Sequence, residues 1–176
     1  MTMYSSGIRL SELTNLLPTD IDSKRMVLHI REGKGGKDRQ ALLSPLLLKC
    51  LRTYWRLRTD KKSPWLFGPP DKYLKSNNSN KKLSATTIVY ILKTAAKAAG
   101  ITRKIHPHAL RHSFAVHLLE KGTNFRHIQY LLGHSSTRSS TIYTSIADIS
   151  KINVKSPLDN LFLIDRWNVN VQQAQN

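Results

Sequence analysis

The chain has 176 residues, a length that fits one domain with a sizeable core. Its 28 Lys and Arg residues outnumber the 11 Asp and Glu residues, which gives a formal net charge of +17. A folded domain with this imbalance is expected to meet a polyanion, and nucleic acid is the first candidate. A merely basic protein without such a partner is the plainer alternative. The few, scattered carboxylates argue against a metal-dependent nuclease, whose site needs them clustered.

The single cysteine, Cys50, excludes a disulfide bond within the chain. It lies in the apolar run 46–51, where a small buried core residue is expected rather than a nucleophile. A reducing compartment fits this cysteine usage. No apolar run approaches the length of a membrane span, and the N-terminus lacks the apolar region of a signal peptide, so the cytoplasm is the expected location.

The N-terminal half predicts a helix, a hairpin and a second helix. Leucines share one face of a helix over 10–17, which Pro18 should end. Strand-like runs at 26–31 and 39–44 flank a Gly-rich hairpin tip. Pro45 opens a helix over about 46–58. Arg9 begins the first helix, close to Gly7, whose lack of a side chain lets backbone approach another group. Arg9 is either a surface arginine paired with Glu12 or a functional group.

The C-terminal half predicts helices separated by clear boundaries. A short extended segment at 65–67 precedes a polar loop over 75–82. Ser84 should cap a helix over about 85–99 that carries apolar residues at helical spacing. A helix from Pro107 should end near Gly122, with its buried face formed by Phe114, Leu118 and Leu119.

A further short helix follows Asn124 and ends at Gly133. Its apolar residues are Ile128, Leu131 and Leu132. The fold class expected from these elements is α+β, mostly α, with a small antiparallel sheet near the N-terminus.

Polar residues that can handle a phosphate gather between residues 108 and 143. His108 and Arg111 are three apart and therefore share a helix face. His134 directly follows a helix stop, and Tyr143 lies nine positions later. A guanidinium grips a phosphodiester with planar donors, and a phenol can attack it once an imidazole accepts the proton.

Each of these residues also has a plainer interpretation. His108 and His112 at i, i+4 could hold a metal, but no Glu lies between them, so no metal site is expected. His134 could cap a helix end, and a lone tyrosine such as Tyr143 is more often a core or surface residue. The ordered set favours a functional site.

Motifs in this order resemble the catalytic domain of the tyrosine recombinases, the phage integrase family, and its Xer-like and mobile-element members most of all. The resemblance covers about residues 4–146 and rests on five motifs, which are specific only together. They are SGIRLSEL around Arg9, GKGGKDR around Lys34, HALRHSFA around Arg111, LLGHS around His134 and TIYT around Tyr143. The fold that it implies is a helical bundle with the small sheet near the N-terminus.

The resemblance implies a role for each motif. Tyr143 would attack the scissile phosphate, leaving a 3′-phosphotyrosyl link and a free 5′-hydroxyl. His108 would accept a proton near Tyr143, and Lys34 would protonate the leaving 5′-oxygen.

In the same way, Arg9 and Arg111 would hold the non-bridging oxygens, with His134 alongside. The linkage keeps the energy of the phosphodiester, so the implied reaction, site-specific recombination by integration or excision, needs neither a metal nor another cofactor. The partner would be double-stranded DNA at the bacterial nucleoid. Further candidates for DNA contact, from their charge alone, are Lys37, Arg39, Lys75, Lys81, Lys82, Lys93 and Lys97.

The resemblance also implies an assembly of four protomers on two duplexes, with residues 147–164 as the candidate segment that packs on a neighbour. Residues 1–164 are expected to form the catalytic domain and 165–176 a disordered tail. Family members carry a separate core-binding domain and further helices before the first arginine motif, whereas only eight residues precede Arg9 here. The chain is therefore expected to be truncated and to expose apolar surface. A non-catalytic DNA-binding remnant and a type IB topoisomerase are the alternatives.

Overall fold

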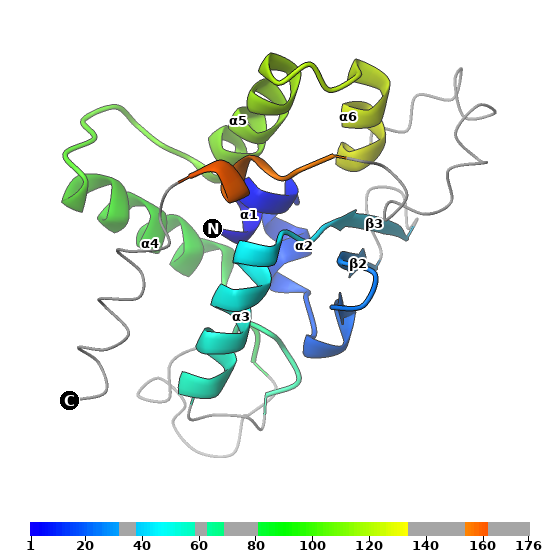
Figure 1. Ribbon diagram of the computed structural model, residues 1–176. Helices are drawn as coiled ribbons and strands as arrows, with labels where there is room; N and C mark the ends of the chain where they lie inside the picture. The colour runs from blue at the N-terminus through cyan, green and yellow to red at the C-terminus, as the bar shows by residue number, and fades with distance from the viewer. Residues whose placement is uncertain (32–37, 59–62, 69–80, 134–153, 162–176) are drawn as a thin grey trace.

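The structure is a computed structural model that describes residues 1–31, 38–58, 63–68, 81–133 and 154–161 (Figure 1). Elements of these residues are α1 (Thr2–Ser6), α2 (Leu10–Thr14), η1 (Pro18–Asp20), β1 (Ile21–Asp22), β2 (Val27–Ile30), β3 (Arg39–Leu42), α3 (Pro45–Leu57), α4 (Ala85–Ala98), α5 (Pro107–Glu120), α6 (Phe125–Leu132) and η4 (Pro157–Asn160). The described residues are mostly helical with one small sheet near the N-terminus, which confirms the predicted fold class.

The described strands form an antiparallel sheet in the order β1-β2-β3, with Leu28 opposite Ala41 and Val27 opposite Leu42. The pairing of β2 with β3 confirms the two predicted hairpin arms, whereas the tip, residues 32–37, lies outside the described residues. Successive side chains of a strand point to opposite faces. Leu28 accordingly joins the core cluster that contains α3, and Val27 joins the cluster that contains α5 and α6.

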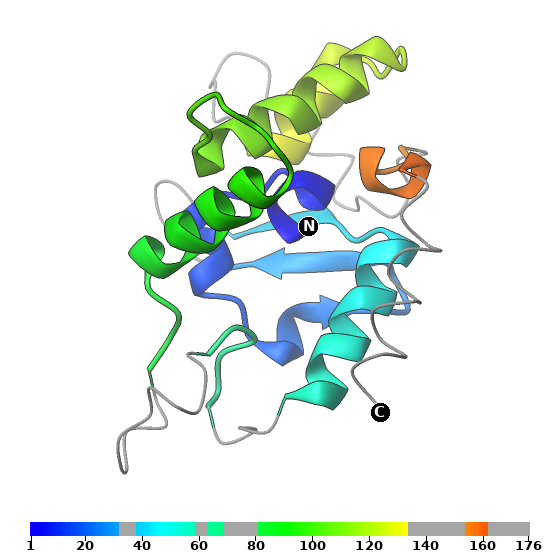
Figure 2. The same cartoon turned by 90° about the vertical axis from the view of Figure 1, so that its left-hand side faces the viewer.

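Helices α5 and α6 pack as a pair next to β3, and α3 lies on the other side of the molecule (Figure 2). Helix α1 contacts α5, β3 and η4, so it joins the two halves. Phe114 of α5 and Leu131 of α6 are 0% exposed. Their cluster holds the two helices, and the side chains that emerge from their ends, in a fixed relation to the sheet.

The predicted helix starts are confirmed by their caps. Ser44 Oγ accepts a hydrogen bond from Leu47 N at 2.9 Å, and Ser84 Oγ accepts one from Thr87 N at 3.0 Å. Asn124 Oδ1 accepts from the N–H of Arg126 at 2.8 Å. In each case the side-chain oxygen satisfies an amide of the first turn that has no partner within the helix.

Several local predictions were wrong. The helix expected over 10–17 ends at Thr14, because the Asp20 carboxylate accepts the N–H of Leu17 at 2.8 Å and favours a 3-10 turn there. Helix α1 was not predicted, since its sequence carries no helix signature. Leu119, expected inside, is 54% exposed.

Helix α4 shows apolar side chains to solvent. Tyr90 is 69% exposed and Ile91 is 53% exposed, and Ala96 is the buried residue of this helix. The predicted apolar spacing is present, but little of the described chain covers it. Cys50 is 5% exposed, which confirms the prediction of a buried core thiol.

The described C-terminal segment, residues 154–161, packs on the chain's own body. Ser156 Oγ donates to Ser5 O at 2.7 Å, and Leu158 is 1% exposed. The carboxylate of Asp159 accepts from Leu46 N at 3.4 Å, at the start of α3. These residues fall within the segment predicted to pack on a neighbour; in the structure they contact α1 and α3 of the same chain. The remainder of 147–164 lies outside the described residues.

Candidate active site

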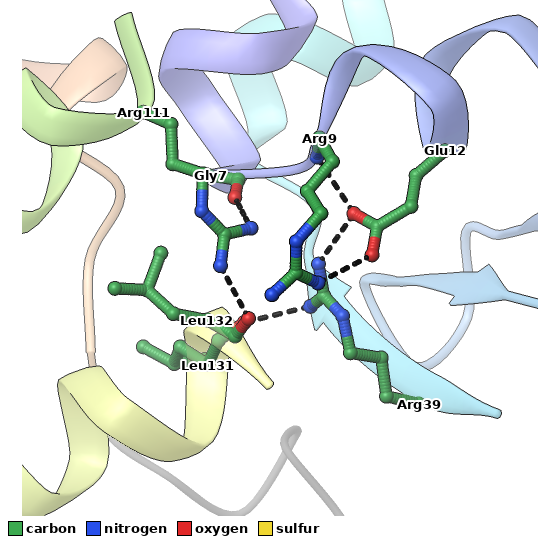
Figure 3. Close-up of polar contacts among 7 residues, drawn as sticks. All are labelled: Gly7, Arg9, Glu12, Arg39, Arg111, Leu131 and Leu132. Atoms are coloured by element: carbon green, nitrogen blue, oxygen red, sulfur yellow. Dashed lines mark hydrogen bonds and ion pairs between the residues drawn. The ribbon is translucent and has the colours of Figure 1, made fainter. Parts of the chain in front are cut away.

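Arg9 lies in the short connection between α1 and α2. Its backbone N–H donates to Glu12 Oε2 at 2.6 Å, and its Nη1 donates to Glu12 Oε1 at 3.0 Å. The ion pair with Glu12 that the sequence offered as the plain interpretation is therefore present. The side chain is nevertheless 22% exposed and lies beside the Arg111 guanidinium (Figure 3). Arg9 is therefore paired with Glu12 and still partly exposed to solvent.

Arg111 reaches the same place from α5. It is 7% exposed, and its two terminal nitrogens donate to Gly7 O and to Leu132 O, each at 2.5 Å. Gly7 has φ +61°, and a Cβ there would lie 2.5 Å from Phe114 Cδ1. Only glycine lets the end of α1 come this close to α5. This confirms the expectation that Gly7 permits a close backbone approach.

The C-terminal end of α6 contributes backbone carbonyls to the same site. The last carbonyls of a helix have no partner within it and carry the negative end of its dipole. Arg111 donates to Leu132 O, and Arg39 of β3 donates to Leu131 O at 2.7 Å. Gly133, in the left-handed conformation at φ +64°, donates its N–H to the two carbonyls before them. The helix that leads into His134 is thus fully capped.

The cluster contains three guanidinium groups and one carboxylate (Figure 3). Glu12, whose side chain is 3% exposed, bonds both Arg9 and Arg39. Burial opposes its ionisation, but the charge of Arg39 and the hydrogen bonds from both arginines outweigh burial and hold the pKa of Glu12 below its ordinary value. Arg111 donates instead to the backbone carbonyls of Gly7 and Leu132.

The excess of positive charge is visible in the arginine pKa values. Burial, together with the nearby charges of Arg9 and Arg39, lowers the pKa of Arg111 to about 10. Burial also lowers the pKa of Arg39, against the opposing attraction of Glu12. With a pKa of about 10, Arg111 remains charged near pH 7. A bound anion would relieve the repulsion among the three guanidiniums, so the cluster is suited to a phosphate.

The structure thus brings together Arg9 and Arg111, and it adds Glu12 and Arg39, which the sequence did not assign to the catalytic set. The signals for them are an acid three residues after Arg9 at a helix start, and an arginine at the start of the strand that follows the hairpin tip. His108 is exposed on α5, one turn before Arg111. Lys34, His134 and Tyr143 lie outside the described residues, so their roles stay predictions.

The basic residues predicted to contact DNA occupy different surroundings. Lys81, Lys93 and Lys97 are exposed. Lys82 Nζ donates to Asn15 Oδ1 at 2.7 Å and stands over the Trp65 ring. Arg39 is 12% exposed and paired with Glu12, so it lies inside the arginine cluster and not on an open surface. Lys37 and Lys75 are outside the described residues.

The described residues also bear on membrane-spanning helices and on groups that could bind a metal ion. Across the described ranges, no helix is long and apolar enough to cross a membrane. In the same part of the chain, no group of three or more His, Cys, Asp or Glu side chains is placed to hold a metal ion.

Comparison with known proteins gives a consistent result. The model of the phage integrase family matches residues 1–149. A putative integrase/recombinase, y4qK, of Sinorhizobium fredii is 41% identical over 160 residues, which cover 91% of this chain and 49% of that protein. Tyrosine recombinase XerA of Pyrococcus furiosus is 46% identical over 147 residues, which cover 83% of this chain and 48% of that protein. The chain spans about half the length of the curated relatives it matches.

Solved structures agree with the sequence relatives. The crystal structure of a XerA recombinase superposes with a TM-score of 0.66 at 34% identity, covering 81% of this chain and 49% of that one. XerH site-specific recombinase bound to its difH substrate gives a TM-score of 0.62 at 27% identity, covering 81% and 40%. With the fold, the paired arginines and these matches in agreement, the chain belongs to the phage integrase family of tyrosine recombinases.

Proposed function

We propose that residues 1–164 form the catalytic domain of a tyrosine recombinase, with 165–176 as a tail, and that it cuts and rejoins DNA at specific sites. The observation that carries the proposal is the placement of Arg9 and Arg111 side by side in a cluster with one carboxylate for three guanidiniums. A phosphodiester supplies the negative charge that this cluster lacks.

The two arginines keep donors for that phosphate. A guanidinium has five N–H donors, and the hydrogen bonds described for Arg111 use one on each terminal nitrogen. The remaining donors of Arg111 and Arg9 would hold the non-bridging oxygens, where negative charge builds up in the transition state. His134, which follows the capped end of α6, would add a hydrogen bond.

The chemical step is a transesterification. The Tyr143 oxygen forms a bond to phosphorus while the bond from phosphorus to the 5′-oxygen breaks. His108 takes the phenolic proton, and Lys34 gives a proton to the 5′-oxygen. The 3′-phosphotyrosyl link retains the phosphodiester energy, so a 5′-hydroxyl can reverse the step without ATP.

DNA as the partner is supported by the family and by the relatives whose structures contain it, such as a Tn1549 transposon integrase in complex with DNA. Such a substrate would place the protein at the nucleoid. The exposed Lys81, Lys93 and Lys97 are proposed backbone contacts, as are Lys37 and Lys75. We also propose a homo-oligomer on DNA, of four copies. Exchange of residues 154–161 between copies would first require them to leave α1 and α3.

Covalent trapping tests the proposal. The protein is incubated in EDTA with nicked suicide duplexes from the ends of its host element or from a pooled library, and adducts are separated on denaturing gels. We expect a protein–DNA adduct that Tyr143→Phe abolishes without loss of DNA binding. An adduct that persists in Tyr143→Phe would disprove the assigned nucleophile.

The same experiment separates the alternatives. A folded protein that binds DNA but forms no adduct would be a non-catalytic remnant. A type IB topoisomerase would form the adduct and relax supercoiled plasmid of any sequence, whereas a recombinase needs its own site.

A further inference from the structure

The polar contacts of the site close into a ring (Figure 3). Arg9 donates to Glu12, which also accepts from Arg39; Arg39 donates to Leu131 O at the end of α6. The next carbonyl, Leu132 O, accepts from Arg111. The second terminal nitrogen of Arg111 donates to Gly7 O. Arg9 follows Gly7 by two residues, so the backbone closes the ring. The ring is made by side chains from α2, β3 and α5 with the backbone of α6 and of the α1–α2 connection.

Arg39 is the member of this ring that joins α2 to α6. Its Nη2 donates to Glu12 Oε2 at 2.8 Å, and its Nη1 donates to Leu131 O at 2.7 Å. Its stem also packs against Gly133, the residue after α6, where an added Cβ would lie 2.5 Å from Arg39 Cδ. Without Arg39, the remaining contacts of the ring would join Glu12 only to Arg9 at the start of its own helix.

We propose that Arg39 is a positioning residue of this site: through Glu12 and the end of α6 it sets the separation and direction of Arg9 and Arg111. The inference rests on the proposed function for its catalytic consequence, but its structural content is independent of it. Arg39 acts on the phosphate through the other two arginines. A direct contact between Arg39 and DNA is disfavoured by its 12% exposure and by its two engaged nitrogens.

The requirement is for a guanidinium and not for charge alone. The planar fork of arginine presents donors to two acceptors in fixed directions, whereas a lysine ammonium is a point charge on a flexible stem. Arg39→Lys keeps the charge near Glu12 and removes the fixed bridge to Leu131 O. This makes Arg39→Lys the informative variant, and Arg39→Met the variant that also removes the charge. Arg103, an exposed arginine between α4 and α5, provides the matched control as Arg103→Lys.

Two readouts test the proposal on the full chain. The first is the rate of Tyr143 adduct formation on a suicide duplex, with DNA affinity and Tm measured in parallel. The second is the set of side-chain Nε–H signals of ¹⁵N-arginine-labelled protein without DNA. We expect Arg39→Lys to slow the adduct by about tenfold or more, as lost preorganisation does, with affinity within about twofold. We also expect it to shift the Arg9 and Arg111 signals, with Arg103→Lys unchanged in both.

The outcomes distinguish the possible failures. If Arg39→Lys leaves the Arg9 and Arg111 signals unchanged, the positioning role is wrong, whatever the adduct shows. A parallel loss of DNA affinity, with a salt dependence reduced by about one ion, would make Arg39 a phosphate contact instead. If the wild-type protein forms no adduct but the arginine signals move in Arg39→Lys, the proposed function fails and the positioning role stands.

Discussion

At the scale of single residues, Glu12 links two arginines of the site, because it binds both Arg9 and Arg39. It is a buried acid in a chain that carries 28 basic residues, and it holds two arginines that would otherwise repel each other. Removing one member of a buried charge group leaves the others buried without a partner, which costs more than the pair contributes. The acid is therefore expected to matter for stability as well as for the direction of Arg9.

Glu12→Gln should lower the free energy of unfolding near pH 7 by about 3–5 kcal/mol, because Arg9 and Arg39 lose their carboxylate. The pKa of Glu12 is lowered in the folded state, so its contribution is complete above its unfolded pKa, about 4.3, and is lost as the pH falls through the lower folded value. Urea unfolding of both proteins from pH 7 to pH 3 should show the difference shrinking in acid.

The matched control is Glu120→Gln, which removes an exposed acid at the end of α5 and should change stability by no more than about 0.5 kcal/mol. If Glu12→Gln and the wild-type protein lose stability in parallel down to pH 3, Glu12 does not hold the ion pairs described here.

At the scale of elements, the site depends on how closely α1 approaches α5. Gly7 ends α1 in the left-handed conformation and turns its carbonyl to Arg111. Phe114 fills the space that a side chain on Gly7 would need. The site is thus assembled where two helices far apart in sequence touch at a glycine.

Gly7→Ala should destabilise the protein more than Gly100→Ala. Gly100 has φ +70° with nothing within 4 Å of an added Cβ, so alanine there bears only the backbone cost, about 1–2 kcal/mol. Alanine at position 7 would also clash with Phe114, which should cost about 1–3 kcal/mol more, as overpacking does in other cores. Thermal or urea unfolding measures both variants. Equal losses would mean that α1 can move away from α5 without cost.

At the scale of the whole molecule, folding brings three arginines together with only one carboxylate, so positive charge in the cluster is not balanced. The pKa of Arg111 is about 10 when folded, well below its ordinary value, so its charged form is disfavoured by folding. This penalty is fully present below pH 10 and fades as the pH rises above it. An anion that occupies the site should offset the penalty and stabilise the fold.

Inorganic phosphate should therefore raise Tm at pH 7 beyond the effect of chloride at matched ionic strength. The gain follows RT ln(1 + [L]/Kd), about 2.7 kcal/mol at a hundredfold excess over Kd. Arg111→Met should abolish the phosphate-specific part, whereas Arg103→Met, an exposed change of the same charge, should retain it. An identical response of all three proteins would place phosphate elsewhere.

The boundaries of α3, α4, α5 and α6 and the paired arms of the hairpin could be read from the sequence, because caps, glycine stops and residue alternation act over a few neighbours. Ser44, Ser84 and Asn124 each cap the predicted helix through their own side chain. Arg9 and Arg111 could be identified because their motifs occur in a recognisable order. Short elements such as α1 and η1 could not, since packing and a single Asp20 contact decide them.

The sequence by itself determined the charge, the fold class and the family motifs, since each depends on residue identity and local spacing. Only the tertiary structure decided that Arg39 lies inside the site and not on an open surface, because its partners are 27 and 92 residues away. It also decided that Ile91 remains exposed on α4 while Phe114 is buried on α5. Periodicity shows which side chains share a helix face, but the burial of that face depends on what the rest of the chain packs against it.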